Sequence, residues 1–236
     1  MTKRIVLLAA VALLAVTASL FGLRSLARSR TFQLFGTIVA HAPTPERRVA
    51  LTFDDGPSLG PIDTILSMLA ARDVRATFFV TGAELAASPD AGRRLVEAGH
   101  ELGNHTYSHR RMALVSSGVV RAEVEPTDSL IRASGHDGPI YFRPPYGYKL
   151  WTLPRYLERT GRTTIMWDIE PDSWPDVAAT PEGIVRHALE RVEPGSIILL
   201  HVWYPSRATS LAAVGTLIDS LRARGYGVGP VRDLLP

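Results

Sequence analysis

The sequence predicts an α/β fold built on parallel strands. After residue 48, short apolar runs alternate with amphipathic stretches of helical spacing, which is the pattern of strands joined by helices. The chain of 236 residues is 46% apolar and 21% charged, so its composition is that of a globular protein. It contains no cysteine, which excludes disulfide bonds, thiolate metal sites and a cysteine nucleophile.

Strands are expected at residues 49–53, 76–80, 101–103, 139–143, 163–167, 196–201 and 226–231. Helices are expected at residues 62–73, 89–99, 118–135, 150–161, 181–192 and 210–225. Pro126 should kink the third of these helices or break it in two, because proline lacks the backbone N–H. About seven strands between residues 48 and 236 fit an open sheet or a small barrel, and periodicity does not choose between them.

The N-terminal segment, residues 1–30, is predicted to be a signal anchor. Residues 5–23 form a run of 19 uncharged residues, long enough to cross ~30 Å of hydrocarbon as a helix. A cleaved signal peptide is the alternative, although such signals usually have a shorter core of about 7–15 residues and a small-residue cleavage site. A buried core helix is the third possibility. Residues 31–47 are expected to be an extended linker, with prolines at positions 43 and 45, before a domain spanning residues 48–236.

The charge distribution argues against nucleic-acid binding. The whole chain has a formal net charge of +3, of which residues 1–30 contribute +5, so the remainder carries −2. A slightly acidic domain does not provide the basic surface that follows a phosphate backbone.

Two adjacent carboxylates, Asp54 and Asp55, directly follow the strand predicted at residues 49–53. The carboxyl ends of strands carry the sites of α/β folds. Neighbouring residues point in different directions, so one carboxylate can bind a metal while the other takes a proton. Taken alone, the Asp-Asp-Gly-Pro motif also fits a plain turn.

Histidines occur at positions 105 and 109, after the short strand at 101–103. In a helical turn, this spacing would put both imidazoles on one face, within reach of one cation. A third ligand would have to be a carboxylate, since there is no cysteine. Two surface histidines at this spacing are the alternative reading.

Two further strand ends carry candidate groups. Arg143 begins the motif Arg-Pro-Pro-Tyr-Gly, a rigid turn that can hold a guanidinium against a carboxylate and expose a backbone N–H. His201 ends a continuous apolar run typical of a strand buried on both faces, and it is a candidate acid or base. A surface arginine in a tight loop and a half-buried structural histidine are the alternatives.

The ordered motifs TFDDGP, HTYSH, FRPPYG, WDIEPDSW and IILLH closely resemble the five-motif signature of the polysaccharide deacetylase family, the NodB homology domain. The resemblance covers residues 48–235. It implies a distorted (β/α) barrel with fewer than eight strands and one divalent metal, usually zinc. It also implies hydrolysis of N-acetyl groups, less often O-acetyl groups, on glycans such as chitin oligomers, peptidoglycan, xylan or surface polysaccharides.

The resemblance also assigns residue roles. The metal ligands are expected to be Asp55, His105 and His109, a set that leaves a position open for water or substrate. Asp54 matches the general base and Arg143 the arginine that pairs with it.

The remaining roles belong to the proton donor and the substrate pocket. His201 resembles the general acid, and the backbone N–H of Tyr146 the oxyanion donor. Leu199 and Trp174 match positions that line the pocket for the acetyl methyl group. Where the family often has an aspartate before this tryptophan, supporting the acid, this chain has Ser173. Either Asp168 or Asp172 is the candidate replacement.

The sequence thus predicts a monomeric, membrane-anchored, extracytoplasmic N-deacetylase that acts on a glycan, secreted if the signal is cleaved. A related amide or formamide hydrolase acting on another sugar, such as a lipid-linked one, and an O-acetyl esterase are the enzymatic alternatives. A non-catalytic glycan-binding module is the alternative of another class. Zinc is the expected metal, and cobalt or nickel also suits two histidines and an aspartate.

Overall fold

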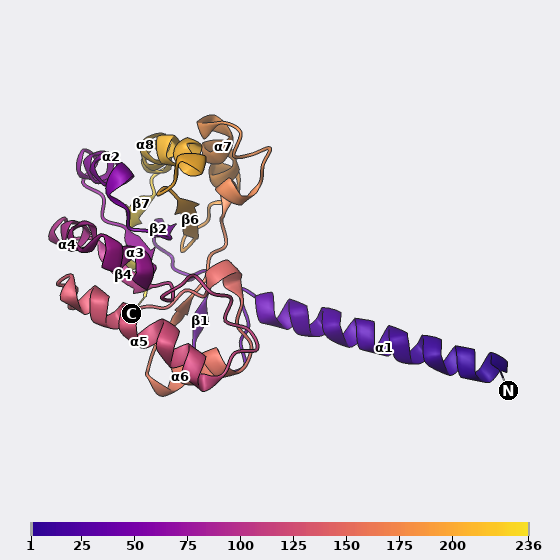
Figure 1. The fold of residues 1–236 in the computed structure, drawn as a ribbon. Helices are drawn as coiled ribbons and strands as arrows, with labels where there is room; N and C mark the ends of the chain where they lie inside the picture. Colours follow the sequence, from indigo (N-terminus) through magenta and orange to yellow (C-terminus); the bar gives the residue numbers. More distant parts are fainter. Residues whose placement is uncertain (1, 236) are drawn as a thin grey trace.

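Parallel strands flanked by helices form the domain, and one long helix projects from it (Figure 1). The structure is a computed structural model that describes residues 2–235. Within these residues there are seven strands: β1 (Ile38–Val39), β2 (Arg48–Asp54), β3 (Thr77–Val80), β4 (Glu101–Asn104), β5 (Thr164–Ile165), β6 (Ile197–His201) and β7 (Gly227–Gly229). The α-helices are α1 (Thr2–Arg28), α2 (Leu59–Ala70), α3 (Gly82–Ala87), α4 (Pro89–Glu97), α5 (Ser117–Ala133), α6 (Thr152–Arg159), α7 (Pro181–Arg191) and α8 (Ala208–Ala223).

All the strand pairs are parallel, which confirms the predicted α/β class. The larger sheet has the order β4-β3-β2-β6, with β7 also pairing with β2, and the smaller sheet pairs β1 with β5. Single bridges connect them further: Phe142 bridges both Asn104 and Thr164, and Ile169 bridges Ile198. A closed barrel is not confirmed, because these links are isolated bridges between two separate sheets.

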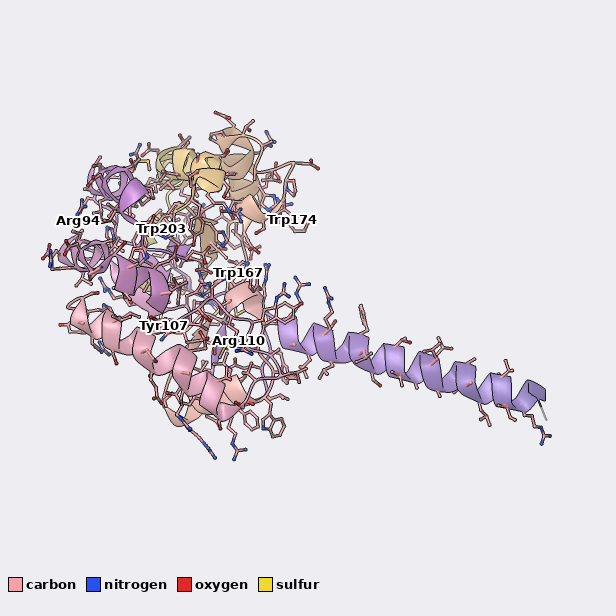
Figure 2. All side chains as sticks on the ribbon, in the orientation of Figure 1. Arg94, Tyr107, Arg110, Trp167, Trp174 and Trp203 are labelled. Atoms are coloured by element: carbon pink, nitrogen blue, oxygen red, sulfur yellow. The ribbon has the colours of Figure 1, made fainter. Side chains whose placement is uncertain are left out.

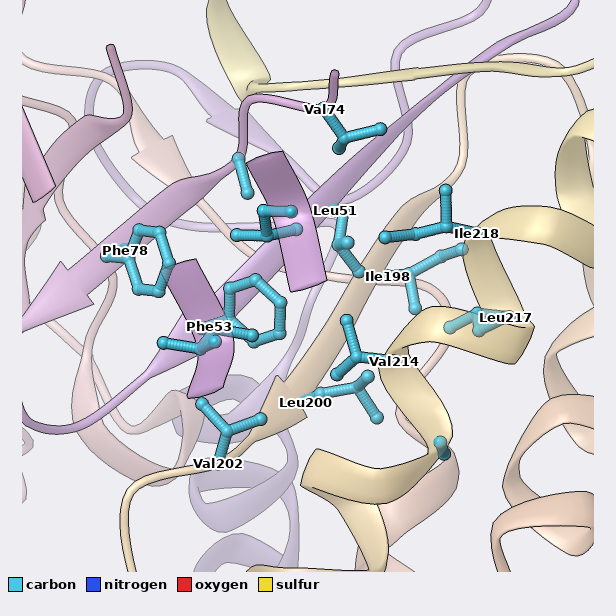
Figure 3. Close-up of a cluster of buried hydrophobic side chains, with 14 of the residues drawn as sticks. Leu51, Phe53, Val74, Phe78, Ile198, Leu200, Val202, Val214, Leu217 and Ile218 are labelled. Atoms are coloured by element: carbon cyan, nitrogen blue, oxygen red, sulfur yellow. The ribbon is translucent and has the colours of Figure 1, made fainter. Parts of the chain in front are cut away.

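The apolar core lies between the larger sheet and the helices that cover it. Alternate residues of β2 and β6 face α8, so Leu51, Phe53, Ile198 and Leu200 pack with the helix residues Val214, Leu217 and Ile218 (Figure 3). The residues between them, including Ala50, Ile197 and Leu199, point to the opposite face and form a second cluster. Asp54 and His201 continue this second face, because side chains in a strand alternate with a period of two.

Two sequence-based expectations need correction, and two elements were not foreseen. Residues 139–143 do not form a strand; Phe142 makes single bridges, and prolines at positions 139 and 144 supply no N–H for a longer ladder. Pro126 does not break helix α5 in two: the helix runs from Ser117 to Ala133, and it packs on α3, β4 and α6. The predicted linker contains β1, and helix α3 was not expected.

Helix α1 runs away from the domain as one continuous element (Figure 1). Its segment Arg4–Arg28 is long and apolar enough to cross a membrane, and a signal sequence has the same properties. The side chains of residues 4–25 are exposed, so α1 is not a buried core helix. Its last turn contacts the domain, where Ala27 is buried and its carbonyl accepts the N–H of Lys149 at 2.9 Å.

Candidate active site

Asp54 and His201 stand at the carboxyl ends of neighbouring strands. They are Cα partners in the parallel pairing of β2 with β6. Because both side chains leave the same face of the sheet, the register alone brings a carboxylate and an imidazole to one edge.

Asp54 is held by a buried arginine. The Nη1 of Arg143 donates to Oδ1 of Asp54 at 2.6 Å and to the hydroxyl of Thr52 at 2.9 Å. The same guanidinium donates to the carbonyl oxygens of Ile165 and Met166 and lies 4.0 Å from the centre of the Phe79 ring. Burial lowers the pKa of Arg143, and the charge of Asp54 opposes that effect. A fully buried guanidinium with all these partners fixes the orientation of the Asp54 carboxylate.

Asp55 belongs to a sharp turn directly after β2. Both Asp55 and Gly56 have positive φ, 71° and 63°. A Cβ on Gly56 would lie 2.5 Å from the Trp203 ring, so glycine is required here for close approach as well as for conformation. The turn separates the two aspartate side chains, and only Asp55 points toward His109, with Oδ1 3.3 Å from its Nε2.

The two histidines lie in a loop, so the expected helical turn is wrong. Thr106 and His109 have positive φ, 68° and 56°. The side chain of Asn104 accepts the N–H of Thr106, and Glu123 accepts the N–H groups of Tyr107 and Ser108. These acceptors take up backbone donors that a helix would bond internally. The imidazole rings of His105 and His109 nevertheless lie 5.0 Å apart.

Asp55, His105 and His109 form a cluster with the geometry of a metal site. One ligand atom from each residue lies within 4.8 Å of the others. The Nδ1 of His105 is 2.7 Å from the Arg143 carbonyl oxygen, so this nitrogen carries the proton and Nε2 has the lone pair. Burial and the neighbouring His105 lower the pKa of His109, which favours its neutral, metal-binding form. One carboxylate and two neutral imidazoles fit a divalent cation.

His201 is paired with Asp172. The Asp172 carboxylate accepts the backbone N–H of His201 at 2.7 Å and lies 3.2 Å from its Nδ1. Burial acts to lower the pKa of His201, but the hydrogen bond and charge of Asp172, with the charges of Asp54 and Asp55, raise it to about 9.

The other carboxylate candidate is engaged elsewhere. Asp168 accepts hydrogen bonds from Ser196 and from the N–H of Ile197, and its Oδ2 lies 2.9 Å from His41. The hydroxyl of Ser173 donates to Glu170. Of the two aspartates, Asp172 is therefore the one in contact with His201.

A cleft of about 720 Å³ opens over these groups. Asp54, Asp55, His105, His109 and His201 line it, together with Tyr146, Leu199 and Trp174. Leu199 is buried, whereas Trp174 is 59% exposed. Tyr146 has a φ of 57°, and its ring lies 4.6 Å from that of His109. Figure 2 shows Trp174 and Trp167, also a lining residue, on the side of the domain from which α1 leaves.

Comparison with known proteins decides the family. A family model described as polysaccharide deacetylase matches residues 41–165. The chain is 33% identical over 202 residues to a chitooligosaccharide deacetylase of Bradyrhizobium sp. (strain ANU 289), covering 80% of this chain and 90% of that protein. The chain belongs to the polysaccharide deacetylase family. It is an enzyme of the hydrolase class, in a family whose deacetylases use a divalent metal.

Other members of the family are similar in sequence and structure. A peptidoglycan-N-acetylglucosamine deacetylase of Bacillus cereus is 32% identical over 184 residues, covering 78% of this chain and 66% of that protein. The crystal structure of the Bc1960 peptidoglycan N-acetylglucosamine deacetylase aligns with a TM-score of 0.78 at 28% identity, over 83% of this chain and 91% of that one. BA3943 of Bacillus anthracis, described as a CE4 family pseudoenzyme, aligns with a TM-score of 0.76 at 27% identity, over 85% of this chain and 69% of that one.

Several residues of the deacetylase-family site were not foreseen from the sequence. Asn104 and Glu123 shape the histidine loop, and Ser210 donates to Asp172 at 3.0 Å. Asn104 could have been predicted, because it directly precedes the candidate ligand His105 in the sequence. Glu123 and Ser210 lie on helices far from the motifs in the sequence, and no pattern identifies them. Arg28 and Arg30, at the end of the N-terminal segment, also line the cleft.

Proposed function

We propose that this chain hydrolyses N-acetyl groups on a glycan, with Asp54 as the base and His201 as the acid. The observation that carries the proposal is the arrangement of the two groups. They are register partners across β2 and β6, each held by its own buried partner, beside a cluster suited to a divalent metal. The family and the named activities of its relatives support N-acetyl sugars as the substrate class.

Asp55, His105 and His109 would hold the metal, and zinc is the metal we propose for this donor set. When bound, it would supply Lewis-acid polarisation of the acetyl carbonyl and a more acidic water molecule. Cobalt and nickel suit the same donors.

Asp54 takes up the proton of the attacking water. Its Oδ1 is occupied by Arg143, whereas its Oδ2 lies 3.7 Å from Nε2 of His105 and so faces the metal cluster. The hydrogen bond from Arg143 keeps the carboxylate oriented. Oδ2 is therefore the accepting atom.

His201 gives a proton to the departing nitrogen. Asp172 occupies Nδ1, which leaves Nε2 for the substrate, and the raised pKa of about 9 keeps the ring protonated at neutral pH. The water oxygen bonds to the acetyl carbon, the carbon–nitrogen bond breaks, and the nitrogen leaves as an amine. The products are acetate and the free amino sugar, and proton exchange with solvent resets both groups.

The cleft residues provide the rest of the site. The backbone N–H of Tyr146, in a turn that brings this residue into the cleft wall, would donate to the developing oxyanion. Leu199 offers an apolar floor for the acetyl methyl, and the exposed face of Trp174 suits stacking on a sugar ring.

We also propose that α1 stays in place as a membrane anchor, with the domain outside the cytoplasm as a monomer. The exposed apolar surface of α1 and its length support the anchor. Isolated bridges at Phe142 and Ile169 are consistent with a distorted barrel as the overall plan of the strands.

Acetate release from a panel of substrates tests the function. The panel contains chitin oligomers, peptidoglycan, acetylated xylan and a polysaccharide extract of the host, each incubated with the zinc-loaded full chain. We expect metal-dependent acetate from at least one N-acetylated member and none from the Asp54→Asn variant. Acetate from xylan alone would instead identify an O-acetyl esterase, and no acetate from any member would favour a non-catalytic protein.

A further inference from the structure

The end of the anchor helix forms part of the wall of the catalytic cleft. Arg28, in the last turn of α1, and Arg30, just beyond it, line the same cleft as Asp54 and His201. Lys149 joins the end of the helix to the domain. Its backbone N–H donates to the carbonyl oxygen of Ala27, and its ammonium group donates to the carbonyl oxygen of Ser29. Lys149 is 1% exposed and Ala27 is 5% exposed. The helix therefore enters the cleft wall directly, with no flexible linker between.

This junction fixes how far the cleft can lie from a membrane. The apolar run ends at residue 23, and Arg28 follows five residues later in the same helix, a rise of about 7.5 Å. The headgroup region on each side of a bilayer is about 5–8 Å thick, given a core of ~30 Å within a total of ~40–45 Å. When α1 spans the membrane, Arg28 lies at the outer edge of the headgroups.

Exposed apolar side chains surround the same junction. Phe32, Leu34 and Trp151 are each more than one third exposed, and Trp151 packs edge-to-face on Phe35 at 4.9 Å. Tryptophan, the residue at position 151, is one of the two residue types enriched at the interface between hydrocarbon and water. These side chains indicate that the junction rests at the lipid surface.

The two arginines at the junction differ in their partners. Arg30 pairs with Glu170 at 2.7 Å and lies 4.6 Å from the centre of the Trp167 ring. Arg28 is exposed and forms no salt bridge with any carboxylate of residues 2–235, and its guanidinium lies 5.5 Å from the centre of the Tyr148 ring. A guanidinium without an acidic partner, at headgroup height and in the cleft wall, suits a phosphate group.

We propose that the substrate is an N-acetylated sugar joined through phosphate to a membrane lipid, and that Arg28 contacts that phosphate. This inference rests on the proposed deacetylase function and specifies its substrate class. A polymer of the cell wall is disfavoured, because a catalytic cleft fixed at headgroup height reaches only what lies on the membrane surface. The lipid holds the sugar at that height, and the phosphate sits between lipid and sugar, where the guanidinium is.

Four matched substrates test the proposal. The zinc-loaded full chain is reconstituted in phosphatidylcholine vesicles and given the same N-acetylated chitotriose in four forms. It is linked through a phosphodiester to a long alkyl chain, through an ether to the same chain, through a phosphodiester to methyl, or through an ether to methyl. We expect kcat/KM for the lipid phosphodiester to exceed that for each of the other three by about tenfold or more. Insoluble peptidoglycan, supplied to the same vesicles, should release the least acetate.

Two arginines on one helix provide the matched variants. Arg28→Gln should lower kcat/KM for the lipid phosphodiester by about tenfold relative to the lipid ether, through KM, because a charge-assisted hydrogen bond is lost. Arg24→Gln lies one turn earlier, is exposed and is not a lining residue of the cleft, so the same ratio should change by less than about twofold. A general attraction of basic residues to the membrane would affect both variants alike.

A third variant tests the rigid attachment. Inserting roughly twelve Gly and Ser residues between Leu23 and Arg24 lets the domain move by ~20 Å. The preference for the lipid phosphodiester over the methyl phosphodiester should then fall, while hydrolysis of peptidoglycan rises. An unchanged preference would contradict the proposal.

The outcomes separate this inference from the function on which it rests. Equal kcat/KM for all four substrates, or a preference for peptidoglycan, would overturn the lipid-linked substrate and leave the deacetylase function intact. An equal loss in Arg28→Gln and Arg24→Gln would overturn the phosphate contact. No acetate from any substrate would overturn the deacetylase function, and this inference with it.

Discussion

The carboxylate of Asp172 contacts His201 at two points, the backbone N–H at 2.7 Å and the ring Nδ1 at 3.2 Å. A third donor, the hydroxyl of Ser210, hydrogen-bonds to the same carboxylate oxygen at 3.0 Å. The aspartate is almost fully buried, so its charge acts on His201 with little screening by water. Asp172 therefore orients the acid and contributes most to raising its pKa, with smaller contributions from Asp54 and Asp55.

The first prediction concerns pH. A pKa of about 9 for His201 keeps the acid protonated below that value, so kcat/KM for an amide substrate should fall as pH rises through about 9. Asp172→Asn removes the negative charge, and the alkaline fall should move to a pH about 1–3 lower. The profile of kcat/KM against pH measures this. Asp168→Asn, whose carboxylate contacts other groups, is the control and should keep the fall near pH 9.

The same pair also affects stability. The pKa of His201 is raised in the folded state above its ordinary value of 6.5, so the folded chain binds this proton more tightly. The resulting stabilisation is fully present below about pH 6.5 and is lost as pH rises through about 9. The difference in unfolding free energy between the wild type and His201→Ala should shrink over that window.

The second prediction concerns the metal. His105→Ala and His109→Ala should each lose bound metal, because two ligands remain where three are required, and both should lose acetate release. A chelator should abolish the activity of the wild type, and Zn²⁺ or Co²⁺ should restore it. Elemental analysis gives the occupancy. His187→Ala, on helix α7, is the control, and full occupancy in both ligand variants would contradict the assignment.

The third prediction concerns the buried ion pair. Arg143→Met leaves the Asp54 carboxylate buried with no cation, which should lower the free energy of unfolding by about 3–5 kcal/mol. Asp54→Asn combined with Arg143→Met should recover part of this loss but no activity. Arg191→Met breaks the exposed pair with Glu190 and should cost less than about 1 kcal/mol. Urea unfolding compares the four proteins, and equal losses in the two arginine variants would count against a paired role for Arg143.

The fourth prediction concerns the anchor. If α1 remains in place, the protein recovered from cells should sediment with membranes and keep its original N-terminus. Mass spectrometry of the N-terminal peptide makes the measurement. A soluble species that begins near residues 20–32 would instead demonstrate a cleaved signal. It would also contradict the lipid-linked substrate proposed above, which requires the anchor.

The sequence predicted best what depends on local pattern. Strands β2, β3 and β6 were found because each is a buried apolar run, and the motifs at their ends carry Asp54 and His201. The segment at 139–143 has a similar apolar sequence but forms only single bridges, because its pairing depends on neighbours that are distant in the sequence. Helix α5 is likewise not broken at Pro126, because packing partners outside the helix contribute to its stability.

Contacts between distant segments escaped prediction. Asp168 and Asp172 are four residues apart, and nothing in the sequence shows which one faces His201; the fold turns Asp168 toward His41 and Ser196 instead. The approach of Arg28 to the cleft depends on Lys149, some 120 residues later in the chain. Spacing rules describe neighbours along a helix or strand, and these contacts follow no such spacing.

The last prediction separates the base from the acid. Asp54→Asn should keep its metal, since Asp54 is outside the cluster of three ligands, yet lose most turnover on every substrate, because attack by water needs the base. His201→Ala should also keep its metal, but its loss should depend on the leaving group. With an amide, the departing nitrogen must gain a proton, and help from a general acid is worth about 10²–10⁴-fold.

An activated aryl acetate removes that need, because a phenolate leaves with little protonation. Acetate release by His201→Ala should therefore be close to that of the wild type on the aryl ester and far below it on the chitin oligomer. Asp54→Asn, measured beside it, should be impaired on both, and elemental analysis checks that each variant retains its metal. Equal damage to ester and amide hydrolysis in His201→Ala would mean that His201 is not mainly the acid, and the role of Asp172 as its partner would then need another explanation.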